Sequence, residues 1–142
     1  MLQIHECSLC SDSGGELIYK NEEYRVIWVN DPDYPGFIRI ILNQHFQEMT
    51  DLPLAKAVQL FKVIFKVELV IREVYHPDKI NLASLGNLVP HLHWHIIPRY
   101  FKDKHFPNPI WGEVTNSSYI PEPWLLLTKG QLFDKLNQIL AK

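Results

Sequence analysis

Residues 91–100 read HLHWHIIPRY, and this stretch places histidines at three alternate positions, His91, His93 and His95. Apolar residues fill the positions between and directly after them. Because alternate side chains of a β-strand point to opposite faces, the pattern predicts a strand with three imidazoles on one face and an apolar row on the other. Histidine binds metals and can act as a nucleophile near neutral pH. Three histidines in this arrangement therefore indicate a functional site.

Taken by itself, the histidine strand fits two chemistries. Three histidines could hold a catalytic zinc ion that keeps an open position for water. One histidine could instead be a nucleophile whose neighbours handle a phosphate or a leaving group. The plainer alternative is a set of polar positions on an exposed face. It fits less well, because surface histidines rarely fall at three alternate positions opposite an apolar row.

The sequence around these histidines predicts a sheet and a long helix. Strand-like runs, rich in β-branched and aromatic residues, alternate with turn residues. Apolar residues at helical spacing predict a long helix that begins near Thr50 or Asp51, either of which could cap it, and ends before Pro77. The five expected strands cover residues 17–20, 24–29, 37–42, 79–85 and 92–98.

The last third of the chain has a different character. Residues 101–123 are rich in proline and aromatic side chains and predict irregular structure, whereas residues 132–140 predict a closing helix. The whole order predicts a single α+β domain, residues 1–142, with a largely antiparallel five-stranded sheet. We expect the helices to cover one face of the sheet and to leave the histidine face accessible.

Composition narrows the class of protein. The 142 residues contain 14 basic and 16 acidic side chains, a formal net charge of −2, so a basic nucleic-acid-binding surface is not expected. No apolar run is long enough for a membrane span, and the start lacks the features of a signal peptide, so a cytoplasmic location is expected. Cys7 and Cys10 are the only cysteines. In a reducing compartment such a pair is more often half of a metal site or a redox pair than a structural disulfide.

The histidine strand resembles the motif of the histidine triad (HIT) family of nucleotidyl hydrolases and transferases, His-φ-His-φ-His-φ-φ, where φ is apolar. Residues 91–97, HLHWHII, match every position of that motif. Gly86 stands five residues before His91, where the family usually has glycine, and the strand–helix–strand order agrees as well. The resemblance covers roughly residues 7–100. It implies a HIT-like fold similar to that of bacterial-type HIT proteins and diadenosine polyphosphate hydrolases.

The resemblance also implies a covalent mechanism. The middle histidine of the motif, His93, would attack the α-phosphorus of a purine nucleotide conjugate. The nucleotidyl-histidine would then pass to water or another acceptor, which splits one difficult displacement into two easier ones. His95 would donate to the phosphate or the leaving group. The implied substrates are dinucleoside polyphosphates, nucleoside phosphoramidates and adenylylated acceptors, and no catalytic metal is required.

Four polar residues are implied as substrate contacts. Asn81 and Asn87 fall near positions where the family has side chains that hydrogen-bond the phosphate. Asn30 and Asp31 follow the second strand, where family members place an acid or an amide against the ribose hydroxyls. Ordinary turn chemistry is the alternative explanation for these residues.

Two positions depart from the family pattern. Leu88 stands where a serine or threonine usually contacts the phosphate, and Phe37 stands where histidine often follows Pro-Gly. These changes leave the nucleophile in place but bear on substrate and rate. Two other functions therefore stay open. One is a nucleotide-binding regulatory protein with little turnover, and the other is a zinc hydrolase whose metal sits on the three strand histidines.

The resemblance gives the two cysteines a role as well. Some HIT relatives carry C-x-x-C near the start and complete a structural zinc site with two histidines, which here would make Cys7, Cys10, His45 and His91 the ligands. His5 is a possible substitute ligand. A redox-active pair and two reduced surface thiols are the alternatives. By the same resemblance, the chain is expected to form a homodimer through the sheet and the long helix.

Overall fold

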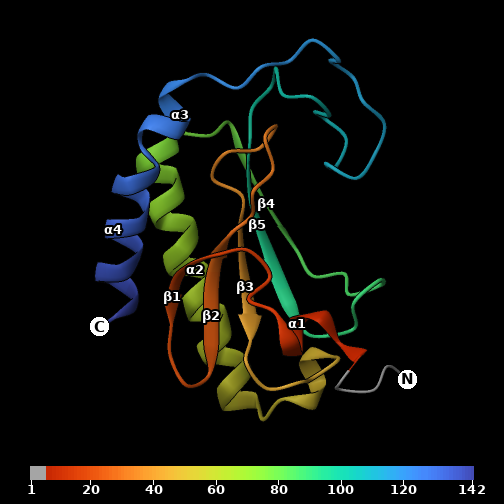
Figure 1. Cartoon of the computed structure of the whole chain (residues 1–142), viewed down its shortest axis with the longest axis vertical. Helices are drawn as coiled ribbons and strands as arrows, with labels where there is room; N and C mark the ends of the chain where they lie inside the picture. Colours follow the sequence, from red (N-terminus) through yellow and green to blue (C-terminus); the bar gives the residue numbers. More distant parts are fainter. Residues whose placement is uncertain (1–5) are drawn as a thin grey trace.

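A computed structural model of the chain describes residues 6–142 and builds them around one five-stranded antiparallel sheet (Figure 1). The α+β class and the five antiparallel strands predicted from the sequence are confirmed. Within the described residues, no helix is both long enough and apolar enough to span a membrane. The strands are β1 (Glu16–Lys20), β2 (Tyr24–Trp28), β3 (Ile38–Leu42), β4 (Lys79–Ala83) and β5 (His93–Arg99), in the spatial order β1-β2-β3-β5-β4.

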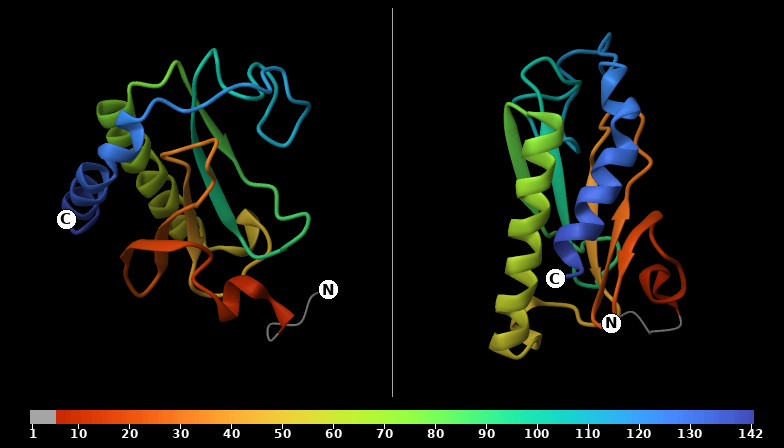
Figure 2. Two further views of the ribbon diagram at one scale, coloured as in Figure 1. Left: turned by 45° about the horizontal axis from the view of Figure 1, so that its top comes forward. Right: turned by 90° about the vertical axis from the view of Figure 1, so that its left-hand side faces the viewer.

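Two helices lie side by side against one face of the sheet (Figure 2). The longer is α2 (Leu54–Tyr75), and α4 (Lys129–Leu140) packs along it. Ile40 of β3 and Ile96 of β5 belong to the core between the sheet and these helices. Because neighbouring strand residues point to opposite faces, His95 faces the other side of the sheet.

The long helix does not begin at Thr50 or Asp51, so the predicted start was wrong. Asp51 instead belongs to a separate 3₁₀ helix, η2 (Met49–Asp51), where its carboxylate accepts a hydrogen bond from Glu48 N at 2.9 Å. The chain is extended again at Pro53, and α2 starts directly after it. The capping residue that the sequence offers therefore stabilises a short turn ahead of the helix.

Other boundaries differ from the prediction by a few residues. β5 starts at His93, so His91 precedes the strand, and β4 ends at Ala83. The irregular structure predicted for residues 101–123 is confirmed. It leads into the short helix α3 (Trp124–Leu127), after which α4 begins earlier than predicted.

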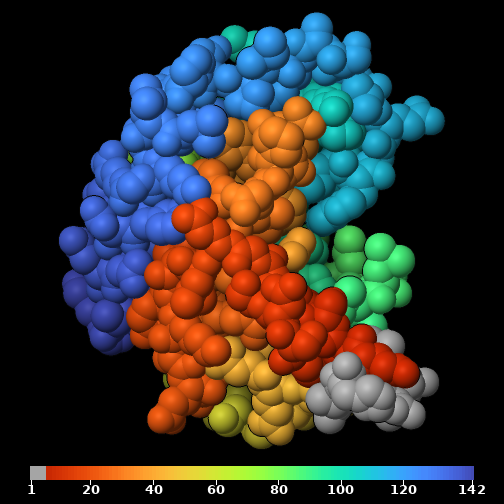
Figure 3. Space-filling view, viewed as in Figure 1, coloured from red at the N-terminus to blue at the C-terminus, as the bar shows by residue number. Residues whose placement is uncertain are grey.

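The helices cover one face of the sheet as predicted, but the histidine face, which we expected to be accessible, is partly covered. The N-terminal turn α1 (Ser8–Ser11) packs on it, with Leu9 in a cluster beside Ile27 and Ile41. At the other end, Ile110 of the segment of residues 101–123 packs against the cluster that contains Phe37 and Ile97, and this segment lies in cyan and blue at the top of Figure 3. Both segments carry apolar side chains that are stabilised by burial against the sheet. Neither segment has the residue pattern of a strand or a long helix, so the sequence did not predict its position.

Candidate functional site

A cavity of about 480 Å³ remains on the histidine face between three segments. They are the N-terminal turn (red in Figure 3), the loop of residues 84–92 between β4 and β5 (green), and the tail, which contributes Trp111. The sheet contributes Arg39, His93 and His95 to the cavity. The other lining residues are Ser8, Leu9, Asp12, Gly14, Leu85, Gly86, Asn87, Leu88 and Val89.

His93 is the first residue of β5, and backbone contacts fix its ring. Its Nδ1 donates a hydrogen bond to the carbonyl oxygen of His91 at 2.6 Å, and Ser84 Oγ donates to the His93 carbonyl at 2.8 Å. Because Nδ1 carries the proton, Nε2 keeps its lone pair, and within the described residues Nε2 makes no hydrogen bond. Burial lowers the pKa of His93, although the His91 carbonyl opposes this, so the imidazole is neutral at pH 7.

His95 is held as a neutral hydrogen-bond donor. Arg39 lies opposite it in the antiparallel register of β3 and β5, and Arg39 Nε donates to His95 Nδ1 at 3.4 Å. The ring proton of His95 is therefore on Nε2. The ring packs against Phe37, His93 and Trp111, with centroid separations of 5.5, 4.9 and 5.0 Å. Burial, and then the charges of Arg39 and His93, lower the pKa of His95 to about 3.

His91 does not line this cavity but joins a cluster of metal-binding side chains. Its Nδ1 lies 3.4 Å from Sγ of both Cys7 and Cys10 and 3.1 Å from His45 Nδ1. Cys10 Sγ is 3.3 Å from His45 Nδ1, and all four potential ligand atoms lie within 4.8 Å of one another. The other ring nitrogen, Nε2, donates to the Leu42 carbonyl at 2.6 Å, so the Nδ1 lone pair faces the cluster.

The cluster has the dimensions of a tetrahedral zinc site. With Zn–S bonds of about 2.3 Å and Zn–N bonds of about 2.0 Å, tetrahedral angles place sulfur about 3.5 Å from nitrogen and two nitrogens about 3.3 Å apart. Three of the sulfur–nitrogen separations here are 3.3–3.4 Å, the nitrogen–nitrogen separation is 3.1 Å, and no two of the four ligand atoms are more than 4.8 Å apart. Two thiolates and two imidazoles are also a ligand set that zinc prefers. The residues therefore fit the ion.

The alternative of a zinc ion on all three strand histidines is not supported. Both ring nitrogens of His91 have partners outside the cavity, and Nδ1 of His93 is bonded to the backbone. Among residues 6–142, the side chains that come close enough to bind a metal are those of the cluster just described. His93 and His95 are not part of it. His5, the possible substitute ligand, lies outside the described residues.

Of the four predicted substrate contacts, the structure brings one to the cavity. Asn87 lies in its wall, in the loop after β4. Asn81 accepts a hydrogen bond from Arg99 Nη1 at 2.7 Å and does not line the cavity. Asp31 accepts a hydrogen bond from a backbone N–H two residues later, and Asn30 is exposed. Whether these residues contact a nucleotide stays a prediction.

Among the cavity residues that sequence reasoning missed, Arg39 and Trp111 contact His95. Arg39 interrupts the apolar run FIRIIL of residues 37–42, and that isolated charge is the signal that could have found it. Trp111 lies in the irregular tail, where no pattern points to it. The two departures from the family motif both lie at the site. Leu88 is 96% exposed in the cavity wall, and Phe37 is buried against His95.

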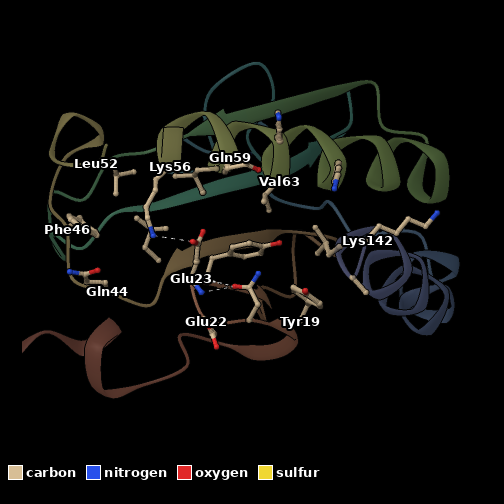
Figure 4. Close-up of a pocket in the computed structure, with 18 residues that line it drawn as sticks. Tyr19, Glu22, Glu23, Gln44, Phe46, Leu52, Lys56, Gln59, Val63 and Lys142 are labelled. Carbon is tan, nitrogen blue, oxygen red and sulfur yellow. Dashed lines mark hydrogen bonds and ion pairs between the residues drawn. The ribbon is translucent and has the colours of Figure 1, made fainter. Parts of the chain in front are cut away.

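A second cavity, of about 500 Å³, lies on the helix side of the sheet, between α2, the β1–β2 hairpin and the chain end (Figure 4). Lys56 Nζ contacts Glu23 Oε1 across it at 3.1 Å. Its lining includes no histidine, no cysteine and none of the predicted site residues. The candidate site is therefore confined to the opposite face of the sheet.

The family model for the HIT domain matches residues 12–102, more than half of the chain. The bis(5'-adenosyl)-triphosphatase of Saccharomyces cerevisiae is 34% identical over 92 residues, which cover 60% of this chain and 45% of the relative. The asymmetrical bis(5'-nucleosyl)-tetraphosphatase of Schizosaccharomyces pombe is 30% identical over 106 residues, covering 70% and 58%. The chain thus spans about half the length of the curated relatives it matches. A histidine triad protein from Marinobacter aquaeolei VT8 has the same fold, with a TM-score of 0.72, 27% identity and coverage of 99% and 97%.

Proposed function

The chain belongs to the HIT domain family, and on that premise we propose that it is a nucleotidyl hydrolase or transferase acting at the α-phosphate of a purine nucleotide conjugate. One observation carries the proposal. His93 donates from Nδ1 to the backbone carbonyl of His91 at 2.6 Å, which leaves the lone pair of Nε2 in a cavity that His95 also lines. Both curated relatives are named as phosphatases of bis-nucleosyl polyphosphates, which supports a phosphate-containing substrate of this class.

The first step is displacement at the α-phosphorus. His93 Nε2 forms a bond to phosphorus while the bond to the leaving group breaks and its electron pair departs with that group. The His91 carbonyl accepts the hydrogen bond from Nδ1–H, so it stabilises the positive charge that grows on the ring. His95 carries its proton on Nε2 and donates to a phosphate or leaving-group oxygen as negative charge builds there.

The second step returns the enzyme to its starting state. A water molecule, or another acceptor, attacks the phosphorus of the nucleotidyl-histidine, and the electron pair of the N–P bond returns to Nε2. With water, the products are a nucleoside monophosphate and a proton released to solvent. Splitting the reaction into two displacements lowers the barrier of each relative to direct attack by water.

Intact-protein mass spectrometry tests this mechanism. The protein is incubated with adenosine 5′-phosphoramidate or diadenosine triphosphate and quenched without acid, beside His93→Ala. An exposed histidine at the end of α2 provides the matched control, His76→Asn. We expect a nucleotidyl adduct or monophosphate release in the parent and the control but not in His93→Ala. Equal turnover by His93→Ala would refute the nucleophile.

A nucleotide-binding regulatory protein with little turnover is the second candidate. Leu88 supports it, because this exposed apolar side chain stands in the cavity wall and offers no hydrogen bond to a phosphate. The same experiment separates the two functions. Tight nucleotide binding without adduct or product would favour the regulatory role.

We also propose a structural Zn²⁺ held by Cys7, Cys10, His45 and His91. The bound ion would tie the N-terminal turn to the residues ahead of β5 and so fix the carbonyl that orients His93. Metal analysis of the purified protein tests this, with an expected content near one zinc per chain. His45→Ala should lose most of the zinc, whereas His76→Asn should keep it. Zinc retained in full by His45→Ala would contradict the assignment.

The predicted homodimer has support from the exposed side of α2. Five large apolar side chains lie along it at helical spacing, each at least 44% exposed, and such rows usually mark a contact surface. They are Leu54, Val58, Phe61, Phe65 and Leu69. Phe65→Glu should convert a dimer to a monomer in light scattering. Lys62→Glu adds the same side chain elsewhere on the helix and should not.

A further inference from the structure

Arg39 is the only lysine or arginine that lines the histidine cavity within the described part of the chain. Its two hydrogen bonds are long, 3.4 Å from Nε to His95 Nδ1 and 3.3 Å from Nη1 to the Gly14 carbonyl. No described carboxylate lies within ion-pair distance of its guanidinium. Asp12 lines the same cavity, but its carboxylate accepts from Gly14 N instead.

The two most buried arginines, unlike Arg39, have short hydrogen bonds or an ion pair to their guanidinium groups. Arg25 donates from Nε and Nη2 to three backbone carbonyls at 2.6–2.9 Å. Arg99 forms a buried ion pair with Asp103 at 2.7 Å. Within the described residues, Arg39 has no ion pair and a single, longer bond to a backbone carbonyl, and burial disfavours its charge and lowers its pKa. A half-buried cation without a counter-charge is costly, so its presence beside the two histidines indicates an anionic ligand.

We propose that Arg39 binds the phosphate next to the α-phosphate and makes the chain selective for nucleotides with two or more phosphates. The inference rests on the proposed function, because His93 and His95 define where the α-phosphate lies. A guanidinium stays protonated near neutral pH, so Arg39 is the permanent positive charge that the described side chains contribute to the cavity. A guanidinium also offers a planar set of donors that matches phosphate oxygens.

The chemistry of the leaving group explains why this selects a class of substrate. When a phosphoanhydride is cleaved, the bridging oxygen leaves with its electron pair as part of a phosphate, which gains negative charge and needs no proton. A nearby cation stabilises that charge. When a phosphoramidate is cleaved, the amine must take up a proton, and an arginine does not release one near neutral pH. Arg39 therefore favours polyphosphates over single-phosphate conjugates.

Binding of AMP and ADP measures the selectivity without any turnover. Calorimetry is done on the parent protein, Arg39→Met, Arg39→Lys and the control Arg72→Met, which removes an exposed charge on α2. We expect the parent and the control to bind ADP at least about 10-fold more tightly than AMP. Arg39→Met should bind both equally, and Arg39→Lys should keep part of the preference. A parent without preference, or a preference unchanged in Arg39→Met, would overturn the inference.

Turnover separates this inference from the proposed function. The ratio of kcat/KM for diadenosine triphosphate to that for adenosine 5′-phosphoramidate should fall about 10- to 100-fold in Arg39→Met. If Arg39→Met slows both substrates equally, Arg39 acts by orienting His95; the inference then fails and the proposed function stands. If the parent cleaves neither substrate, the proposed function fails, and the ratio of ADP to AMP affinity still decides the inference.

Discussion

Asp103→Asn should destabilise the fold far more than an equivalent change at the surface. Both side chains of the Arg99–Asp103 pair are at most 1% exposed. One oxygen of Asp103 accepts from Arg99 Nε at 2.7 Å and from Tyr100 N at 3.1 Å. The other accepts from Arg99 Nη2 and from the N–H groups of His105 and Phe106, at 2.8–3.1 Å.

An asparagine has the same shape but cannot satisfy this set of donors. Whichever oxygen becomes the amide nitrogen, at least two N–H donors then face another donor, and the guanidinium of Arg99 loses its counter-charge inside the protein. Breaking one side of a buried pair in this way costs about 3–5 kcal/mol of the free energy of unfolding. Urea denaturation of the full chain, monitored by far-UV circular dichroism, measures the loss.

Asp33→Asn is the matched control. Asp33 pairs with Lys104 at 3.0 Å, close to the same segment of the tail, but the two side chains are 30% and 34% exposed. Solvent screens this pair, so its loss should cost less than about 1 kcal/mol. Losses of equal size in the two variants would refute the reasoning that burial, and not the charge pair itself, sets the cost.

The same carboxyl predicts a response to acid. Burial alone would raise the pKa of Asp103, but Arg99 and the backbone N–H groups outweigh it and lower the pKa. A folded-state pKa below the unfolded value means that the contribution to stability is present above about pH 4 and is lost as pH falls through the folded-state pKa. Between pH 5 and pH 2, the free energy of unfolding should therefore fall less steeply with decreasing pH in Asp103→Asn than in the parent.

Three further predictions follow from packing, protonation and metal binding. Gly36→Ala should lower the free energy of unfolding by several kcal/mol, because φ is +89° and a Cβ would collide with the Tyr75 ring. In the control Gly130→Ala the new Cβ meets nothing within 4 Å, so the urea midpoint should equal or exceed that of the parent. His95 has a folded-state pKa of about 3, so the unfolded chain takes up its proton first as pH falls below 6.5. The contribution of His95 to the free energy of unfolding should then decrease by at most about 1.4 kcal/mol per pH unit. Between pH 6.5 and 4, the free energy of unfolding should therefore depend less steeply on pH in His95→Asn than in the parent. EDTA should lower the thermal unfolding midpoint of the parent but not of Cys7→Ser, and an equal drop in both would count against zinc.

Local rules explain why much of this protein could be predicted from its sequence. Alternating histidines and apolar residues gave the strand and its two faces, because side chains of a strand alternate whatever surrounds it. The long helix ends at Tyr75, ahead of Pro77 as predicted, because the residue before a proline avoids helical geometry. Its start was wrong because Asp51, a good cap on composition, serves a separate turn, and only the packed chain decides which turn a cap completes.

The candidate site itself is assembled from residues that are remote in the sequence. Cys7 and His91 are 84 residues apart and yet within 3.4 Å, a proximity that only the resemblance to a family could anticipate. Arg39 reaches His95 because the register of β3 and β5 puts them opposite each other. Trp111 packs against His95 from the irregular tail, whose sequence has no periodicity that would predict this contact. The sequence determined which side chains could do chemistry, since period and residue type are local. The tertiary structure decided which of them meet, since strand register and the path of irregular segments depend on long-range packing.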